Sequence, residues 1–265
     1  MQNEIVKIMK EYGDTVSVYA KNLSDNKVLV SHRCNKVFRA PTVMKIMVML
    51  EALKEVEEGQ YKLDEGIEIK EAGISYLSLI RDLSISTYTL KDLIILMMTA
   101  NDYTAINTLL NLFGLEKINN RIEKIGLMDT KVQRKMLDFS AIEMGKENIT
   151  SIRDMSNILE KIYNRSLFKD KEISDLSVEM LKYQRVGRGV RNYIPEWEST
   201  YRSGEVGDFY HDIGIVFLEN AHFILGVFVD DALDPLEALE IICRIKKAFL
   251  KNVSKESDVV QTEGH

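Results

Sequence analysis

Apolar residues near the N-terminus follow first a helical spacing and then a strand spacing. Residues 1–12 place apolar side chains three and four positions apart and end at Gly13, which predicts a helix. Thr15–Ala20 then alternates with period two, which predicts a strand. Lys27–Ser31 has the pattern of its hairpin partner, across a polar turn at residues 22–26.

The middle of the chain has helical periodicity almost throughout, from residue 43 to about residue 185. Few Gly or Pro residues interrupt it, and no linker or low-complexity segment divides it. The clearest predicted helices are 43–57, 89–98, 102–112, 116–125, 151–164 and 172–183.

Strand patterns return after the helical part. They predict strands at Thr200–Arg202, Asp212–Leu218 and Phe223–Val229, with a turn at Glu219–His222 between the last two. A last helix is expected from Pro235 to about Asn252, because proline is tolerated in the first turn of a helix.

Strands at both ends and helices between them predict an α+β fold. The simplest packing is one five-stranded antiparallel sheet made from N- and C-terminal segments, covered by the terminal helices, with an all-helical lobe inserted between the strand groups. We expect a single domain at 1–252, with an α/β subdomain of 1–38 plus 186–252, a helical subdomain of 39–185 and a polar tail at 253–265. A cleft where the lobe meets the sheet is the natural place for a site.

Composition narrows the functional classes. The chain has 265 residues, is 45% hydrophobic and 29% charged, and carries a net charge of −6, so we expect a globular protein without a nucleic-acid partner. The longest apolar run, Ile46–Leu53, is interrupted by Glu51, so no membrane span is expected. The N-terminus lacks the pattern of a signal peptide, which predicts a cytoplasmic location, or a secreted or periplasmic one if a leader has been removed. Neither the two cysteines nor the four histidines have metal-ligand spacing, so neither a metal nor another cofactor is expected.

Thr42 and Lys45 form the first candidate site. A hydroxyl and an amine three positions apart share one face of a helix, and the first turn adds unpaired backbone N–H groups. These groups can supply a nucleophile, a general base and donors to an oxyanion. The alternative is an N-capping Thr42 followed by a solvated Lys45.

Two further polar motifs interrupt regular elements. Asn101-Asp102-Tyr103 falls between two apolar helical runs, and the alternative to a functional role is a helix break capped by Asn101 and Asp102. Tyr201-Arg202-Ser203-Gly204 ends a predicted strand, where the alternative is a polar strand end that turns at glycine.

Taken in order, the three motifs resemble S-x-x-K, S-D-N and K-T-G of the class A β-lactamases and the wider penicillin-binding group. Segments beyond the motifs carry the resemblance over most of residues 1–252, among them residues 37–42, 104–110 and 211–216. The resemblance implies a β-lactamase/transpeptidase-like fold and acyl transfer to a hydroxyl nucleophile.

The departures from the family pattern concern proton chemistry. Thr42 stands where the family has Ser, and its extra methyl group restricts the hydroxyl. Asn101 replaces the Ser that relays a proton to the leaving nitrogen, and the phenol of Tyr103 is a possible substitute. Arg202 replaces Lys; it keeps the charge and can bind a carboxylate, but it cannot release a proton near neutral pH.

The loop that carries the deacylating Glu in the family also differs. Arg134 fits the loop-anchoring Arg of the family, but the Glu position is occupied by Met136. Asp138 is the nearest carboxylate and could replace that Glu only in a different register; a cap or salt bridge within the loop is the preferred interpretation. Penicillin-binding proteins also lack this Glu, so its loss implies slow release of an acyl group.

The resemblance therefore implies a hydrolase that acts on β-lactam or D-alanyl amide bonds and deacylates slowly. Thr42, Lys45, Asn101, Tyr103 and Asp138 are the candidate catalytic residues. The candidate substrate-binding residues are Arg202, Ser203, Gly204 and Glu205, the backbone N–H groups of Thr42 and Glu205 forming the oxyanion hole. The expected partner is a small β-lactam or peptidoglycan-like carboxylate. The alternatives are a non-catalytic ligand-binding or sensor protein on the same scaffold, or a chain in which Thr42 replaces a native Ser.

Overall fold

The computed structural model describes residues 2–40, 43–182, 198–206, 209–230, 232 and 235–262. The chain divides into two compact units. The first consists of Met1–Lys36 and Arg188–His265, and the second of Val37–Gly187. The chain therefore leaves the first unit after Lys36 and returns to it after Gly187; the sequence pattern put these boundaries after residues 38 and 185.

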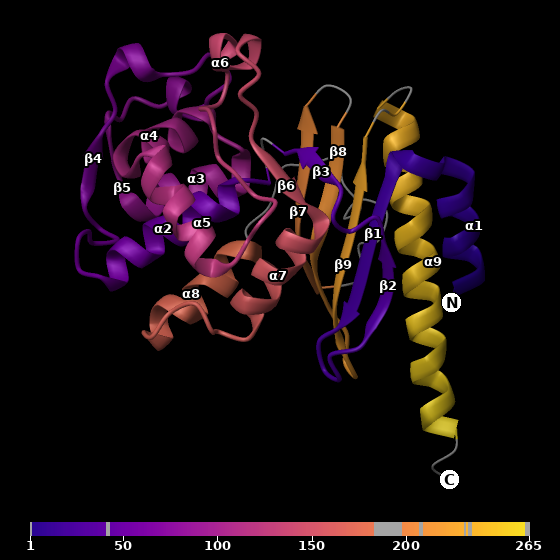
Figure 1. Cartoon of the computed structure of the whole chain (residues 1–265). Coiled ribbons are helices and arrows are strands. Elements are labelled where there is room, and N and C mark those ends of the chain that lie inside the picture. Colours follow the sequence, from indigo (N-terminus) through magenta and orange to yellow (C-terminus); the bar gives the residue numbers. More distant parts are fainter. Residues whose placement is uncertain are drawn as a thin grey trace. The chain divides into compact units, whose positions relative to one another are not determined.

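The first unit contains a five-stranded antiparallel sheet with the order β2-β1-β9-β8-β7 (Figure 1). Its strands are β1 (Val16–Asn22), β2 (Val28–His32), β7 (Glu198–Val206), β8 (Phe209–Phe217) and β9 (His222–Val229). Strand β1 pairs with β9 over its whole length, from Val16 opposite Val229 to Asn22 opposite Phe223. This pairing joins the N-terminal hairpin to the C-terminal strands, so the predicted sheet is confirmed.

The two terminal helices, α1 (Gln2–Tyr12) and α9 (Pro235–Thr262), pack together on one face of this sheet (Figure 1). Ile8 of α1, Val227 of β9 and Phe249 of α9 belong to one buried cluster. Apolar residues at helical spacing on the two helices and at every second position of the strands supply this core, because each element buries one face.

Helix α9 continues to Thr262 rather than ending near Asn252. Residues 253–262 lose the apolar spacing used to place its end, but they contain no Gly or Pro before Gly264. The loss of apolar periodicity after Asn252 therefore does not mark the end of the helix. Neither α9 nor another helix in the described ranges is long and apolar enough to cross a bilayer.

Helix α2 (Lys45–Glu57) is the central helix of the second unit, and every side chain from Lys45 to Leu53 is buried. It contacts helices on several sides, which explains why its sequence is apolar nearly all round. The described part of this unit also contains the helices α3 (Leu90–Ala100), α4 (Tyr103–Phe113), α5 (Leu115–Ile125), α6 (Phe139–Glu143), α7 (Ile152–Tyr163) and α8 (Lys171–Lys182).

Two carboxylates of α2 are buried against α5. Glu51 is 0% exposed and lies 2.9 Å from Nε of Arg121, and Glu55 lies 2.6 Å from Nζ of Lys117. Burial raises the pKa of Glu51, and the hydrogen bond from Arg121 opposes that shift. The residue that interrupts the longest apolar run of the sequence is therefore half of a buried ion pair.

The second unit is not all-helical, which corrects the sequence prediction. It contains two small antiparallel sheets, one of β3 (Val37–Arg39) and β6 (Ile149–Ser151), the other of β4 (Gly66–Glu68) and β5 (Thr87–Thr89). Strands of three residues are too short to show a period-two pattern. The 3-10 turns among the described residues, η1 (Gly13–Thr15), η2 (Glu71–Gly73) and η3 (Leu79–Asp82), are likewise too short to be predicted from a pattern.

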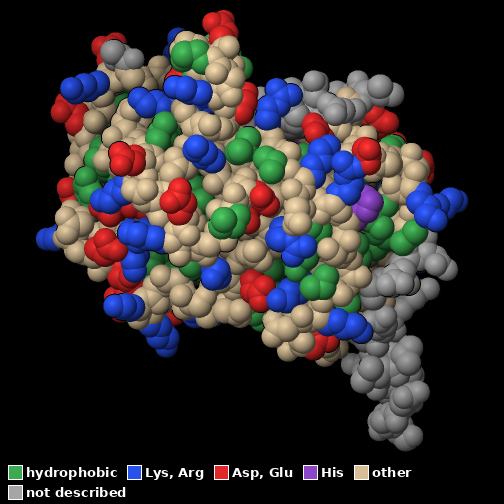
Figure 2. Space-filling view, viewed as in Figure 1, with side chains coloured by type: hydrophobic (Ala, Val, Ile, Leu, Met, Phe, Trp, Pro, Cys, Tyr) green, Lys and Arg blue, Asp and Glu red, His purple; other side chains and the backbone are tan. Residues whose placement is uncertain are grey.

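Charged side chains of both signs are interspersed over the described residues on the face shown in Figure 2. Lysine and arginine do not form a continuous basic field on that face.

Candidate active site

Lys45 is a buried lysine at the start of α2. It is 1% exposed, and its Nζ donates a hydrogen bond to Oδ1 of Asn101. The first and second motifs of the sequence are therefore in direct contact, although they are 56 positions apart. A solvated Lys45, one of the alternatives from sequence, is wrong.

Thr42 lies outside the described residues. The two residues that follow it, Val43 and Met44, are 0% and 1% exposed and form the turn that leads into α2. The N–H of Ile46 donates to the carbonyl of Val43 at 3.2 Å, and the N–H of Met47 to that of Met44 at 2.9 Å. The backbone between the proposed nucleophile and Lys45 is thus a buried, hydrogen-bonded turn.

Asn101 ends α3 in the left-handed region, with a φ of 54°. Asparagine tolerates this conformation better than most residues with a Cβ atom. Asp102 follows as the N-cap of α4, so the predicted break between two helical runs is confirmed. Because the chain turns here, the Asn101 side chain faces Lys45 instead of continuing the surface of α3.

Asp102, at the junction between α3 and α4, is a carboxylate that accepts hydrogen bonds from three residues. It is 1% exposed, and Oγ of Ser78 lies 2.8 Å from each of its oxygens. The N–H of Leu79 donates to Oδ2 at 2.7 Å, and the N–H of Ala105 to Oδ1 at 3.0 Å. Asp102 therefore both caps α4 and ties the segment at residues 78–79 to the residue after Asn101. Ser78 was missed from sequence because no periodicity connects positions 24 residues apart.

Tyr103 begins α4 and is half-buried. Burial raises the pKa of its phenol; nearby Tyr76 adds to that shift, and the positive charge of Arg134 opposes it. The phenol is therefore protonated at neutral pH and able to donate a proton or a hydrogen bond.

Arg134 anchors the loop that contains Met136 and Asp138. Its Nε and Nη2 atoms lie 2.9 and 2.8 Å from Oε2 of Glu147, and its Nη1 donates to the carbonyl of Lys135 at 3.0 Å. Asn148, 0% exposed, accepts from the N–H of Arg134 at 3.0 Å and donates to its carbonyl at 3.1 Å. The loop is thus closed on itself by the ion pair with Glu147 and by the amide side chain of Asn148.

Met136, at the position expected for the deacylating Glu, is fixed by Asn107 of α4. The N–H of Met136 donates to Oδ1 of Asn107 at 2.8 Å, and Nδ2 of Asn107 donates to its carbonyl at 3.0 Å. Met136 is 7% exposed and presents a thioether with no proton chemistry. Asn107 was not singled out from sequence; an amide within the apolar stretch Thr104–Leu110 was the available signal.

Asp138 lies two residues further on, at the N-cap of α6. Its Oδ1 accepts from the N–H of Ala141 at 3.1 Å and from Oγ of Ser140 at 2.9 Å. The Ala141 N–H, and then the Ser140 hydroxyl, lower the pKa of Asp138. This is the capping role preferred from sequence, and a catalytic role for Asp138 stays a prediction.

The third motif lies on β7, of which the structure describes the backbone. Arg202 pairs with Ile213 of β8, Ser203 with Asp212, Gly204 with His211 and Glu205 with Tyr210. Their side chains lie outside the described residues. The carboxylate of Asp212, opposite Ser203, is buried and bonded by Nζ of Lys246 at 2.6 Å. The convergence of β7 with Lys45 on one cleft stays a prediction.

Within the described residues, acidic, histidine and cysteine side chains form no group of three or more that could hold a metal ion.

Comparison with known proteins gives the family. A family model described as the β-lactamase enzyme family matches residues 1–253, and the chain therefore belongs to that family. The β-lactamases CARB-3 and PSE-4 of Pseudomonas aeruginosa are each 25% identical to it over 177 residues. The alignment covers 65% of this chain and 62% of each relative, so the chain spans a little under two thirds of their length.

Solved structures share the fold over nearly the whole chain. A β-lactamase from Sphaerobacter thermophilus has a TM-score of 0.85 at 22% identity and covers 96% of this chain and 98% of its own. A β-lactamase from Chitinophaga pinensis has a TM-score of 0.87 at 20% identity, with 95% and 98% covered. PBP-A has a TM-score of 0.83 at 19% identity, with 96% and 97% covered. The β-lactamase/penicillin-binding fold expected from the motifs is confirmed.

Proposed function

We propose that this protein is an acyl-transfer hydrolase that acts on β-lactam or D-alanyl amide bonds and releases its acyl group slowly. The observation that carries the proposal is the contact between buried Lys45 and Asn101, because it joins two of the three motifs in the part of the chain that the structure describes. The family membership and the curated β-lactamase relatives support the same class of reaction.

In the proposed acylation, Oγ1 of Thr42 forms a bond to the substrate carbonyl carbon while Lys45 accepts the hydroxyl proton. The backbone N–H groups of Thr42 and Glu205 stabilise the resulting oxyanion. The carbon–nitrogen bond then breaks, and the proton passes from Lys45 to the leaving nitrogen, directly or through the phenol of Tyr103.

Asn101 positions the Lys45 amine through its amide oxygen. Arg202, with Ser203 and Gly204 beside it on β7, binds the substrate carboxylate, since a guanidinium can hold a carboxylate with two parallel hydrogen bonds. In this proposal Asn101 is a positioning residue, and Arg202 gives the site its preference for an anionic substrate.

Slow deacylation follows from Met136. Hydrolysis of the Thr42 ester needs a water molecule activated by a base, and Met136, whose backbone Asn107 holds at this point of the loop, has a side chain that cannot accept a proton. Asp138, the nearest carboxylate in the loop, is engaged with the first turn of α6. We therefore expect the acyl-enzyme to accumulate.

The test is intact-mass spectrometry of the purified chain over a time course with penicillin G. This probe is chosen because a mutant of the fold relative PBP-A was solved as an acyl-enzyme complex with penicillin G. We expect a lasting adduct with the mass of one penicillin G molecule, no adduct with Thr42→Ala, and faster adduct formation with Thr42→Ser.

If neither the native chain nor Thr42→Ser forms an adduct, the acyl-transfer proposal is wrong and a non-catalytic ligand-binding role is favoured. An adduct with Thr42→Ser alone would also overturn the proposal for the native chain, because Thr42 would then not be a nucleophile. An adduct that persists in Thr42→Ala would assign the nucleophile to another residue.

A further inference from the structure

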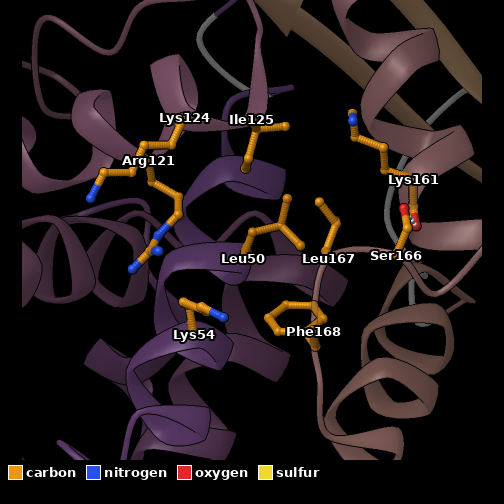
Figure 3. A pocket seen from close by; sticks show the side chains of 9 residues that line it. All are labelled: Leu50, Lys54, Arg121, Lys124, Ile125, Lys161, Ser166, Leu167 and Phe168. Atoms are coloured by element: carbon orange, nitrogen blue, oxygen red, sulfur yellow. Dashed lines mark hydrogen bonds between the residues drawn. The ribbon is translucent and has the colours of Figure 1, made fainter.

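The second unit contains a pocket of about 290 Å³ that is separate from the Lys45 site (Figure 3). It opens beside the middle of α2, where Leu50 is five residues beyond Lys45, roughly 7.5 Å along the helix. Its volume is close to the lower limit for small-ligand pockets, roughly 300 Å³. The lining residues are Leu50, Lys54, Arg121, Lys124, Ile125, Lys161, Ser166, Leu167 and Phe168.

The lining has an apolar wall and basic residues around it. Leu50 is 2% exposed, and Leu167 and Phe168, from the segment after α7, lie beside it (Figure 3). Four lining residues carry a positive charge at neutral pH, and none is acidic: Lys54, Arg121, Lys124 and Lys161.

Carboxylates outside the lining neutralise two of the four cations. Arg121 is bonded to Glu51 at 2.9 Å, and Lys54 to Glu57. Within the described part of the chain, Lys124 and Lys161 form no ion pair. Lys161 is partly buried, whereas Lys124 is exposed, so Lys161 carries the less hydrated of the two unpaired charges that line the pocket.

The segment that forms the wall is held at both ends. The N–H and Oγ of Ser166 both donate to the carbonyl of Lys161, at 3.0 and 3.2 Å. At the other end, the N–H groups of Lys169 and Asp170 donate to Oε1 of Glu57, the latter at 2.8 Å. Burial acts to raise the pKa of Glu57, but these N–H groups and Lys54 outweigh it and lower that pKa, so Glu57 holds the segment as a carboxylate.

We propose that this pocket binds a small amphipathic organic carboxylate. Its apolar body packs on Leu50, Leu167 and Phe168, and its carboxylate pairs with the ammonium group of Lys161, with Lys124 adding a longer-range attraction. A purely inorganic anion would leave the apolar wall exposed to water, and a neutral apolar molecule would leave Lys161 uncompensated. The proposal does not depend on acyl transfer at Thr42.

The experiment is a titration of the ¹⁵N-labelled full chain with octanoate, octan-1-ol and inorganic phosphate, followed by backbone amide shifts. We expect saturable octanoate binding with shifts centred on Leu50, Lys161 and Leu167, and affinities for octan-1-ol and phosphate at least about tenfold weaker. Octanoate binding should also weaken as salt is raised.

Matched variants separate this pocket from other lysines and from the proposed substrate site. Lys161→Gln should weaken octanoate binding about tenfold without changing octan-1-ol binding. Lys161→Glu should abolish octanoate binding. Exposed Lys70, outside the pocket, supplies the control Lys70→Gln, which should bind as the native chain does. Arg202→Gln should also keep full octanoate affinity.

Several results would overturn the proposal: no saturable octanoate binding, equal binding of octan-1-ol, unchanged affinity in both Lys161 variants, or shifts centred on Lys45. Loss of binding in Arg202→Gln would likewise overturn it, by moving the carboxylate to the proposed substrate site.

Discussion

Two hydrogen-bonded contacts in the second unit each join segments that are distant in sequence. One holds a side chain with an ionisable group, and the other holds the backbone of a residue whose side chain has none. At the start of α2, the amide of Asn101 holds the ionisable amine of Lys45. On the loop, the amide of Asn107 holds the backbone of Met136, whose side chain is chemically inert toward protons. A backbone clamp is independent of the side chain that it presents, so under the proposed function the loop can keep its backbone geometry without a base at Met136.

This difference assigns the two halves of the proposed reaction to separate places. In the proposed reaction, the Lys45 contact serves acylation, whereas the Met136 position concerns deacylation. The geometry of both is maintained by hydrogen bonds from α4 or its junction with α3. Substitutions at the two places should therefore change different rate constants.

The largest effect is expected from Lys45→Met, which removes the amine and keeps an unbranched apolar side chain. The rate of adduct formation with penicillin G should fall about 1,000-fold, because the general base for Thr42 is lost. The measurement is the time course of the adduct by intact mass. The exposed loop residue Lys135 provides the control, since Lys135→Met should leave the rate unchanged. Equal rates in the native chain and Lys45→Met would remove Lys45 from the mechanism.

A large loss of stability is expected from Asp102→Ala. It removes the cap of α4 and leaves the buried hydroxyl of Ser78 and the N–H of Leu79 without their acceptor. The free energy of unfolding should fall by about 3 kcal/mol, measured by urea denaturation. Ser78→Ala, which removes one of these hydrogen bonds, should cost about 1 kcal/mol. Similar losses in the two variants would mean that Asp102 stabilises the fold through its hydrogen bond to Ser78 alone and that its bonds to the N–H groups of Leu79 and Ala105 add little.

Met136→Glu tests the other half of the comparison. With its backbone held by Asn107, a carboxylate at this position could activate water, and the penicillin G adduct should decay about 100-fold faster than in the native chain. The matched control is Met136→Gln, which has a similar shape but accepts no proton. Equal decay in the Glu and Gln variants would show that the absent base does not limit deacylation.

The sequence predicts the helices that carry Lys45 and Asn101 and the loop that carries Met136. It predicts only some of the contacts that hold them. The break at Asn101-Asp102 was predictable because polar capping residues stand between two apolar periodic runs, and Lys45 because of its spacing from Thr42. Such signals are local. They report where a helix starts or ends, and the family resemblance was needed to bring the motifs together.

The connections that were missed are bonds from a side chain to a distant backbone or charge. Asn107 reaches Met136 over 29 residues, and Glu51 reaches Arg121 over 70. Sequence separations of this size follow no helix or strand periodicity. In addition, a buried Glu51 looks the same in sequence as a surface carboxylate. Only the packing of α2 against α5 distinguishes the two cases.

The smallest effect is expected from Asp138→Asn, which keeps an oxygen at the N-cap of α6 but removes the charge. The pKa of Asp138 is lowered from 3.8 in the folded chain by the Ala141 N–H and the Ser140 hydroxyl, so the charged cap stabilises the fold above the unfolded pKa and loses this contribution as pH falls through the folded pKa. Urea denaturation should therefore show a slight deficit for Asp138→Asn at pH 7 that disappears at acidic pH. Adduct decay should be unchanged, because the proposal gives Asp138 a cap and no share in slow deacylation. Slower decay in Asp138→Asn, with an unchanged decay rate in Met136→Gln, would instead make Asp138 the base and reverse the contrast between the two places.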